Sequence, residues 1–154
     1  MPNKVIRHAE DYKPGEVFDL GTYDVTREEL VEFALKYDPF PFHLDDEAAR
    51  STMFGSIIAS GWLTALVWLR LMHRGCFCVE TTLGSPGHEE MKWPSPVRPG
   101  DRLHGRAEVT ESRISKSRLG IGFVRYTATL MNQDAELVFQ TTSTLIVKSR
   151  SAAK

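Results

Sequence analysis

The sequence predicts one α+β domain in which a long buried helix is wrapped by a curved antiparallel sheet. Three observations support this fold class. Residues 56–75 carry almost no charge until Arg70, as expected for a helix that is covered on most sides. The C-terminal half is rich in β-branched and aromatic residues in partly alternating patterns. The length of 154 residues suits a single domain with one hydrophobic core.

The N-terminal quarter predicts a strand followed by a helix. Residues 4–23 contain short apolar pieces around the turn KPGE and suit a lead-in segment with one strand. A helix is expected from Thr26, because TREELVEFALKY places apolar residues at helical spacing and pairs Thr26 with Glu29 in a capping box. Proline disfavours helical geometry in the residue before it, so Asp38-Pro39 ends this helix.

Two further helices are expected before the strands. The stretch DDEAARSTMF predicts a short helix with Asp45 or Asp46 as its N-cap. After Gly55, the run SIIASGWLTALVWLRLMHRG predicts the buried helix, because it is too long for a strand and rich in Ala, Leu and Met in its second half. Basic side chains in its last turn and Gly75 beyond them are consistent with its end.

The C-terminal half predicts an antiparallel run of strands. The segments DRLHGRAEVTES, LGIGFVRYTATLMN and ELVFQTTSTLIVK are separated by RISKSR and NQDA, which suit hairpin connections. Residues 79–83 and 91–93 are candidates for further strands. A curved antiparallel sheet that covers one apolar helix describes the hot-dog fold. We expect this domain to span residues 1–148 and residues 149–154 to be a disordered tail.

Composition argues against several classes of partner. The formal charge of −1 comes from 19 basic and 20 acidic residues spread along the chain, so neither a nucleic acid nor a membrane surface is an expected partner. A secretory leader and an apolar run long enough to span a membrane are both missing from the pattern, so a cytoplasmic location is expected.

Cys76 and Cys78 form a C-x-C pair that could begin a metal site. His73 and His88 are the only nearby candidate ligands, and their spacing matches no known zinc motif. The two cysteines are better explained as small buried hydrophobic residues. No metal site is therefore predicted.

The stretch YDPFPFHLDD places Asp38 and His43 five residues apart on a link that its prolines keep from being helical. A carboxylate and an imidazole are a common pair for acid–base catalysis near neutral pH. On the residues alone the alternative stays open: Asp38 would end one helix, and His43 would cap or pack against the next.

Three stretches, in this order, resemble motifs of the MaoC-type acyl-CoA dehydratases and (R)-specific enoyl-CoA hydratases. DPFPFHLD is similar to D-x-N-P-x-H-x-D, FGSIIASG to F-x-x-x-I-A-H-G, and PVRPGD to P-V-x-x-G-D. The resemblance covers roughly residues 15–148. It implies a hot-dog homodimer or higher homo-oligomer that binds acyl-CoA near the subunit interface. It also implies that Asp38 and His43 are the catalytic pair and that Gly61 is a backbone donor.

The activity that this resemblance implies is the reversible addition of water to a 2-enoyl-CoA thioester, which gives a 3-hydroxyacyl-CoA without a metal or redox cofactor. Gly61, Ser60, Phe40 and Trp62 are the candidate substrate-binding residues. Ser60 lacks the G-x-S-x-G pattern of a nucleophile elbow and suits a helix N-cap or a ligand contact. For Trp62, packing in the core or in a dimer remains the alternative.

Two positions depart from the family pattern. Phe40 stands where the family has asparagine, and Ser60 stands where it has histidine. Two other functions therefore stay open. A hot-dog thioesterase would use a carboxylate and water on the same carbonyl, although the spacing of Asp38 and His43 matches the dehydratases. A catalytically degenerate subunit would bind acyl chains or pair with an active partner.

Overall fold

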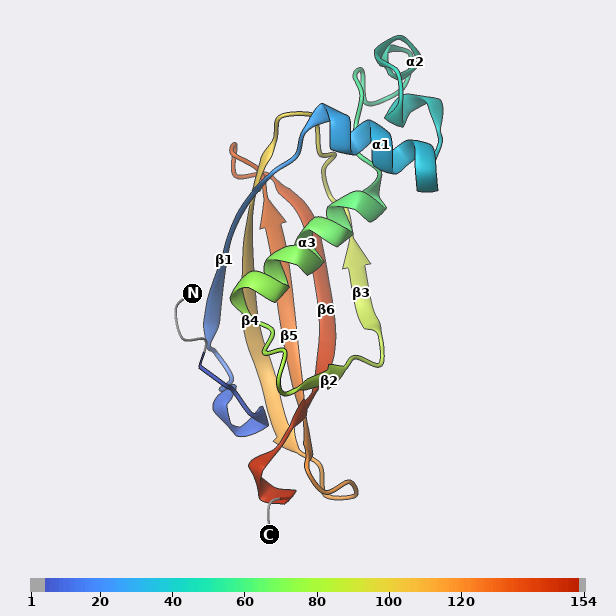
Figure 1. Ribbon diagram of the computed structural model, residues 1–154. Helices are drawn as coiled ribbons and strands as arrows, with labels where there is room; N and C mark the ends of the chain where they lie inside the picture. The colour runs from blue at the N-terminus through green and yellow to red at the C-terminus, as the bar shows by residue number, and fades with distance from the viewer. Residues whose placement is uncertain (1–4, 153–154) are drawn as a thin grey trace.

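The computed structural model describes residues 5–152 and shows one hot-dog domain, which confirms the predicted fold class (Figure 1). The strands are β1 (Val17–Asp24), β2 (Thr82–Gly84), β3 (His88–Lys92), β4 (Arg102–Ile114), β5 (Ile121–Met131) and β6 (Leu137–Lys148). The α-helices are α1 (Arg27–Tyr37), α2 (Asp46–Arg50) and α3 (Gly61–Gly75). Three short 3-10 helices are η1 (Ala9–Asp11), η2 (Pro41–His43) and η3 (Arg150–Ala152).

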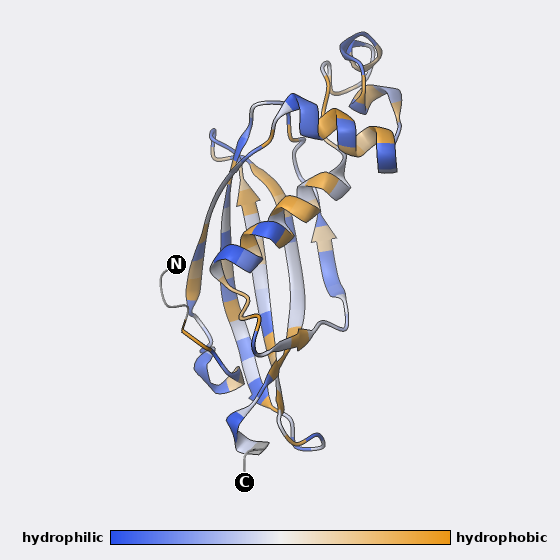
Figure 2. Ribbon diagram, viewed as in Figure 1, coloured by the Kyte–Doolittle hydropathy of each residue, from blue (hydrophilic) through white to orange (hydrophobic). Residues whose placement is uncertain are grey.

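The sheet is antiparallel and follows the order β1-β4-β5-β6-β2, with β3 also paired to β6. Helix α3 lies along one face of this sheet, and α1 and α2 lie together near one end (Figure 1). Leu71 and Met72 of α3 are fully buried with Leu103, Leu130 and Phe139 of the strands. Figure 2 shows that α3 is mostly hydrophobic along its length and that hydrophilic residues lie towards its C-terminal end, where its last turn carries basic residues. The core therefore lies between α3 and the sheet.

Local signals account for the start of α1. The Thr26 hydroxyl accepts a hydrogen bond from the Glu29 N–H at 3.2 Å. The Glu29 carboxylate accepts a hydrogen bond from the Tyr23 hydroxyl at 2.6 Å instead of completing the predicted capping box. The box is thus half formed, because Tyr23 of the neighbouring strand competes for the carboxylate. Asp45 caps α2 as one of the two predicted residues, accepting from the Ala48 N–H at 3.0 Å.

The predicted start of the buried helix near residue 56 is wrong. Residues 57–59 have no regular secondary structure, and α3 begins at Gly61. The Ala59 N–H donates to the Val97 carbonyl at 2.8 Å, and the Ile58 N–H donates to the Phe42 carbonyl at 3.4 Å. Residues 58 and 59 therefore pair with other segments of the chain and not with a helix. The helix begins after Ser60, whose hydroxyl accepts from the Trp62 N–H and caps it.

The first residues of the predicted tail, Ser149 and Arg150, form hydrogen bonds to η1. The Ser149 hydroxyl donates to Glu10 at 2.5 Å, and the Arg150 guanidinium clamps the Asp11 carboxylate at 2.9 and 2.7 Å. These bonds tie the segment after β6 to η1. Residues 153–154 of the predicted tail lie outside the described residues. Of the helices in residues 5–152, none has the length and apolar character needed to cross a membrane.

Candidate active site

Asp38 and His43 lie side by side. Asp38 is the C-cap of α1, and His43 is the last residue of η2. The distance from His43 Nε2 to Asp38 Oδ2 is 3.4 Å. The His43 side chain is 6% exposed and the Asp38 side chain 20% exposed, so the pair is largely shielded while the carboxylate still reaches solvent. The turn between the two residues therefore brings the predicted pair together.

Backbone contacts determine which nitrogen of His43 carries its proton. Nδ1 lies 2.8 Å from the Ile58 carbonyl oxygen, which can only accept a hydrogen bond. Nδ1 is therefore the protonated nitrogen, and in the neutral imidazole Nε2 is an acceptor that faces Asp38. A donor O–H placed beside both Nε2 and Oδ2 would satisfy the two acceptors together.

Ser60 holds the carboxylate. Its hydroxyl donates to Asp38 Oδ2 at 2.7 Å while accepting from the Trp62 N–H at 3.3 Å. Ser60 is fully buried. The predicted helix N-cap is thus confirmed, and the same hydroxyl links the start of α3 to the acid of the pair. Sequence reasoning proposed a cap or a ligand contact and missed this link, because Ser60 and Asp38 are distant in the sequence.

Gly61 begins α3 in direct contact with an indole. Trp93 Nε1–H donates to the Gly61 carbonyl at 2.7 Å. A Cβ at position 61 would lie 2.9 Å from Trp93 Nε1 and 3.0 Å from Cε2. The room that glycine provides is therefore taken up by Trp93. In the part of the chain that the structure describes, the Gly61 N–H meets no hydrogen-bond acceptor, which leaves it available to an oxygen of a ligand.

A cavity of about 640 Å³ adjoins this pair. His43, Gly61, Thr64 and Trp93 line it together with mainly apolar residues from the 53–59 and 94–98 segments. Its lining residues are Phe42, His43, Met53, Phe54, Ile58, Ala59, Gly61, Thr64, Trp93, Pro94, Ser95, Pro96, Val97 and Arg98. An apolar pocket with few polar groups is typical of a small-molecule site. We call it the His43 pocket.

Three predicted substrate-binding residues do not line the His43 pocket: Ser60, which is fully buried, Phe40 and Trp62. Phe40 is 57% exposed, and its ring stacks on Phe42 with the ring centroids 5.3 Å apart. Trp62 is 60% exposed and packs edge-on against Trp93. Phe42 lines the pocket, as do Trp93 and Arg98, which were not predicted. Arg98 lies within the PVRPGD motif and Trp93 three positions before it, which was the available signal.

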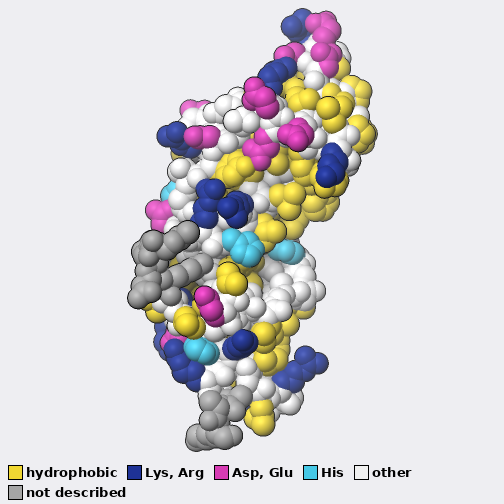
Figure 3. Space-filling model, viewed as in Figure 1, with side chains coloured by type: hydrophobic (Ala, Val, Ile, Leu, Met, Phe, Trp, Pro, Cys, Tyr) yellow, Lys and Arg dark blue, Asp and Glu magenta, His cyan; other side chains and the backbone are white. Residues whose placement is uncertain are grey.

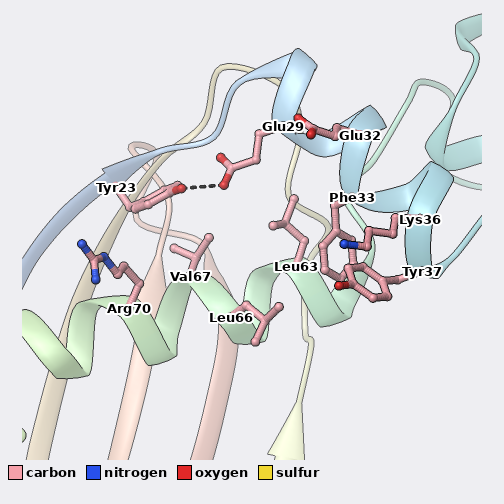
Figure 4. A pocket seen from close by; sticks show the side chains of 10 residues that line it. All are labelled: Tyr23, Glu29, Glu32, Phe33, Lys36, Tyr37, Leu63, Leu66, Val67 and Arg70. Atoms are coloured by element: carbon pink, nitrogen blue, oxygen red, sulfur yellow. Dashed lines mark hydrogen bonds between the residues drawn. The ribbon is translucent and has the colours of Figure 1, made fainter.

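A second cavity, of about 350 Å³, lies between α1, α3 and Tyr23 of β1 (Figure 4). Figure 4 shows Leu63, Leu66 and Val67 of α3 on one side and Glu29 and other residues of α1 on the other, with the Tyr23–Glu29 hydrogen bond at one end. Acidic and hydrophobic side chains mix over this part of the surface (Figure 3). Neither Asp38 nor His43 lines this cavity. His43 lines the His43 pocket, and Asp38 adjoins that pocket through its 3.4 Å approach to His43.

Cys76 and Cys78 follow α3 and are both buried. Within residues 5–152, no group of three or more His, Cys, Asp or Glu side chains is placed to hold a metal ion. The Cys78 thiol donates to the Glu80 carboxylate at 3.2 Å. The buried position agrees with the prediction that these cysteines are small core residues.

Residues 10–130 match the MaoC-like domain in a comparison with protein families. This chain belongs to the MaoC-like domain family. It is similar to the crystal structure of a MaoC-like dehydratase from Rhodospirillum rubrum, with a TM-score of 0.87, 38% identity, and coverage of 94% of this chain and 98% of that one. The resemblance drawn from the three motifs is thus confirmed.

Two other similar proteins extend the comparison. An uncharacterised protein from Bacillus subtilis is 27% identical over 139 residues, which cover 90% of this chain and 97% of that protein. The unliganded (R)-hydratase of Pseudomonas aeruginosa has a TM-score of 0.72 and 24% identity, with coverage of 91% of this chain and 84% of that one. At that identity the likeness shows a shared fold.

Proposed function

We propose that this MaoC-like protein is a hydro-lyase that adds water reversibly to a 2-enoyl-CoA thioester, giving a 3-hydroxyacyl-CoA. The observation that carries the proposal is the Asp38–His43 pair beside an apolar pocket whose lining includes Gly61 at a helix N-terminus. Hydration of an enoyl thioester requires a base for water, an acid for the α-carbon and a donor for the developing oxyanion. The side chains of Asp38 and His43 and the N–H of Gly61 are the three groups that can meet these requirements at one site.

In the proposed reaction, Asp38 and His43 divide the two proton transfers. A water molecule held between Nε2 of His43 and the Asp38 carboxylate loses a proton to the pair as its oxygen bonds to the β-carbon. The pair then supplies a proton to the α-carbon, so protons balance over the reaction. Ser60 keeps the carboxylate in place, and the Ile58 carbonyl keeps Nε2 of His43 free to accept.

Gly61 supplies the third requirement in this proposal. Negative charge develops on the thioester oxygen as water adds to the enoyl group. The Gly61 N–H lies at the positive end of the α3 dipole, where a developing anion is favoured. The proposed reaction requires no metal ion or redox group.

The proposal is tested with purified protein and crotonyl-CoA. We expect Asp38→Asn and His43→Gln each to lower the rate of enoyl absorbance loss by about 10²- to 10⁴-fold. Asp46→Asn and His104→Gln are matched controls, because their side chains are exposed and pair with Arg27 and Asp19, away from the pocket. Near-wild-type turnover in either pair variant, with the fold intact by circular dichroism, would contradict the proposal.

The same assay separates the other candidate functions. Release of free CoA from saturated acyl-CoA would support a thioesterase, and tight binding without turnover would support an acyl-binding subunit.

We also propose that the protein acts as a homodimer whose sheets join. Strand β3 supports this idea, because among the described residues it pairs only with β6 and leaves one edge open. Light scattering after size exclusion measures the mass.

A further inference from the structure

Arg98 is the only lysine or arginine that lines the His43 pocket, and no aspartate or glutamate lines it. The guanidinium donates to two uncharged acceptors, the Phe54 carbonyl at 2.9 Å and the Ser56 hydroxyl. Within residues 5–152, Arg98 forms no ion pair, whereas Arg102 and Arg125 each clamp a carboxylate at 2.7 Å. The positive charge of Arg98 is therefore not neutralised by the protein.

Asp101, the acidic residue nearest to Arg98 in the sequence, does not neutralise the charge of the guanidinium. Asp101 accepts from the backbone N–H of Arg98 at 2.9 Å and from the Gln133 amide at 3.0 Å. Its carboxylate thus serves the turn between Val97 and β4. A guanidinium has five N–H donors, and two of them are used here. Three donors remain in the planar fork that suits a phosphate or a carboxylate.

The chain places this cation within reach of the reacting end of the pocket. Val97 pairs with Ala59, two residues before Gly61, and the Arg98 side chain then extends back to Ser56 and Phe54. Five Cα-to-Cα steps separate Ser56 from Gly61, so these two Cα atoms lie at most about 18 Å apart. One thioester substrate can therefore contact both the Gly61 N–H and the Arg98 guanidinium.

We propose that Arg98 forms an anion-binding subsite of the His43 pocket and recognises a negatively charged group on the thioester substrate. The group is either a phosphate of the CoA carrier or a carboxylate at the far end of the acyl chain, since both suit the free donors of the guanidinium. This inference rests on the proposed function for its substrate class. Its test uses binding alone, so that it can fail independently of turnover.

The experiment measures the binding of four unreactive saturated thioesters by calorimetry. Butyryl-pantetheine has neither anion, butyryl-CoA has the phosphates, succinyl-pantetheine has the acyl carboxylate, and succinyl-CoA has both. We expect Arg98→Gln to raise the Kd of at least one anionic thioester by about 10- to 100-fold while leaving butyryl-pantetheine within about threefold. If Arg98→Gln selectively weakens the binding of butyryl-CoA, the recognised group is the phosphate. If it selectively weakens the binding of succinyl-pantetheine, the recognised group is the carboxylate.

Two further variants separate charge from local structure. Ser56→Ala removes an anchor of the guanidinium but keeps its charge, and we expect less than a threefold change for every ligand. Arg98→Lys keeps the charge without the fork and should retain part of the selectivity. An equal loss for butyryl-pantetheine and the anionic thioesters in Arg98→Gln would overturn the proposal. So would unchanged binding of all four, or no measurable binding by the wild type. Hydration of crotonyl-CoA, assayed separately, reports on the proposed function.

Discussion

Gly61→Ala tests the contact between the start of α3 and Trp93. The new Cβ would lie 2.9 to 3.2 Å from three atoms of the indole, closer than carbon atoms normally approach. Trp93 is 39% exposed, so the indole can turn outward. That movement would break its 2.7 Å hydrogen bond to the Gly61 carbonyl and would shift one wall of the His43 pocket.

The expected change in the free energy of unfolding follows from three contributions. Overpacking costs about 1–3 kcal/mol, and the lost hydrogen bond costs about 0.5–1.5 kcal/mol. The higher helix propensity of alanine offsets up to about 1 kcal/mol. Because the indole can yield, we expect a net destabilisation of about 1–2 kcal/mol. We also expect hydratase activity to fall at least about tenfold, since the movement of Trp93 shifts a wall of the His43 pocket.

A double-mutant cycle with Trp93→Ala isolates the contact. Urea unfolding gives the free energy for wild type, both single variants and the double variant. With the indole removed, Gly61→Ala should be neutral or stabilising by up to about 1 kcal/mol. An equal cost of Gly61→Ala with and without Trp93 would refute the reasoning, because the obstacle would then lie elsewhere.

Three other predictions concern stability. Ser60→Ala removes the α3 cap and the bond to Asp38 and should cost about 1–2 kcal/mol in urea unfolding, with lower hydration activity. Leu71→Ala empties a fully buried position and should cost about 2–5 kcal/mol by the same measurement. The hydrogen bond from Arg150 lowers the pKa of Asp11 to about 2, so the stability that this pair contributes is present above about pH 4 and is lost as the pH falls towards 2. Arg150→Gln should return the pKa of Asp11 towards 3.8 in an NMR titration; an unchanged pKa would contradict this.

The elements that the sequence predicts well are those with local causes. Thr26 caps α1 through a residue three positions away, and Asp45 does the same for α2. Pro39 prevents continuation of α1 whatever surrounds it. The start of α3 depends instead on Ala59, whose N–H pairs with Val97 from a distant segment. No pattern within residues 56–60 shows that pairing, and their apolar composition is compatible with a helix.

The residues of the candidate site likewise include some with a local signal in the sequence and others whose contacts are with distant segments. Asp38 and His43 are found from their spacing and from the family motifs, because the short link between them constrains their separation. Ser60 contacts Asp38 across 22 positions, and Trp93 contacts Gly61 across 32. Such contacts depend on how α3 lies against the neighbouring segments. The sequence shows the types of these residues but not that they contact one another.

The departure at Phe40 matters less to the acid–base pair than its position between Asp38 and His43 suggests. The Phe40 N–H donates to the Asp38 carbonyl at 2.8 Å, and the Phe40 carbonyl accepts from the His43 N–H at 2.9 Å. Any residue other than proline can make these backbone bonds. The phenyl ring stacks on Phe42 and is 57% exposed. Phenylalanine in place of the family's asparagine therefore alters the outer surface of the turn, while the backbone that sets the 3.4 Å approach of His43 to Asp38 is retained.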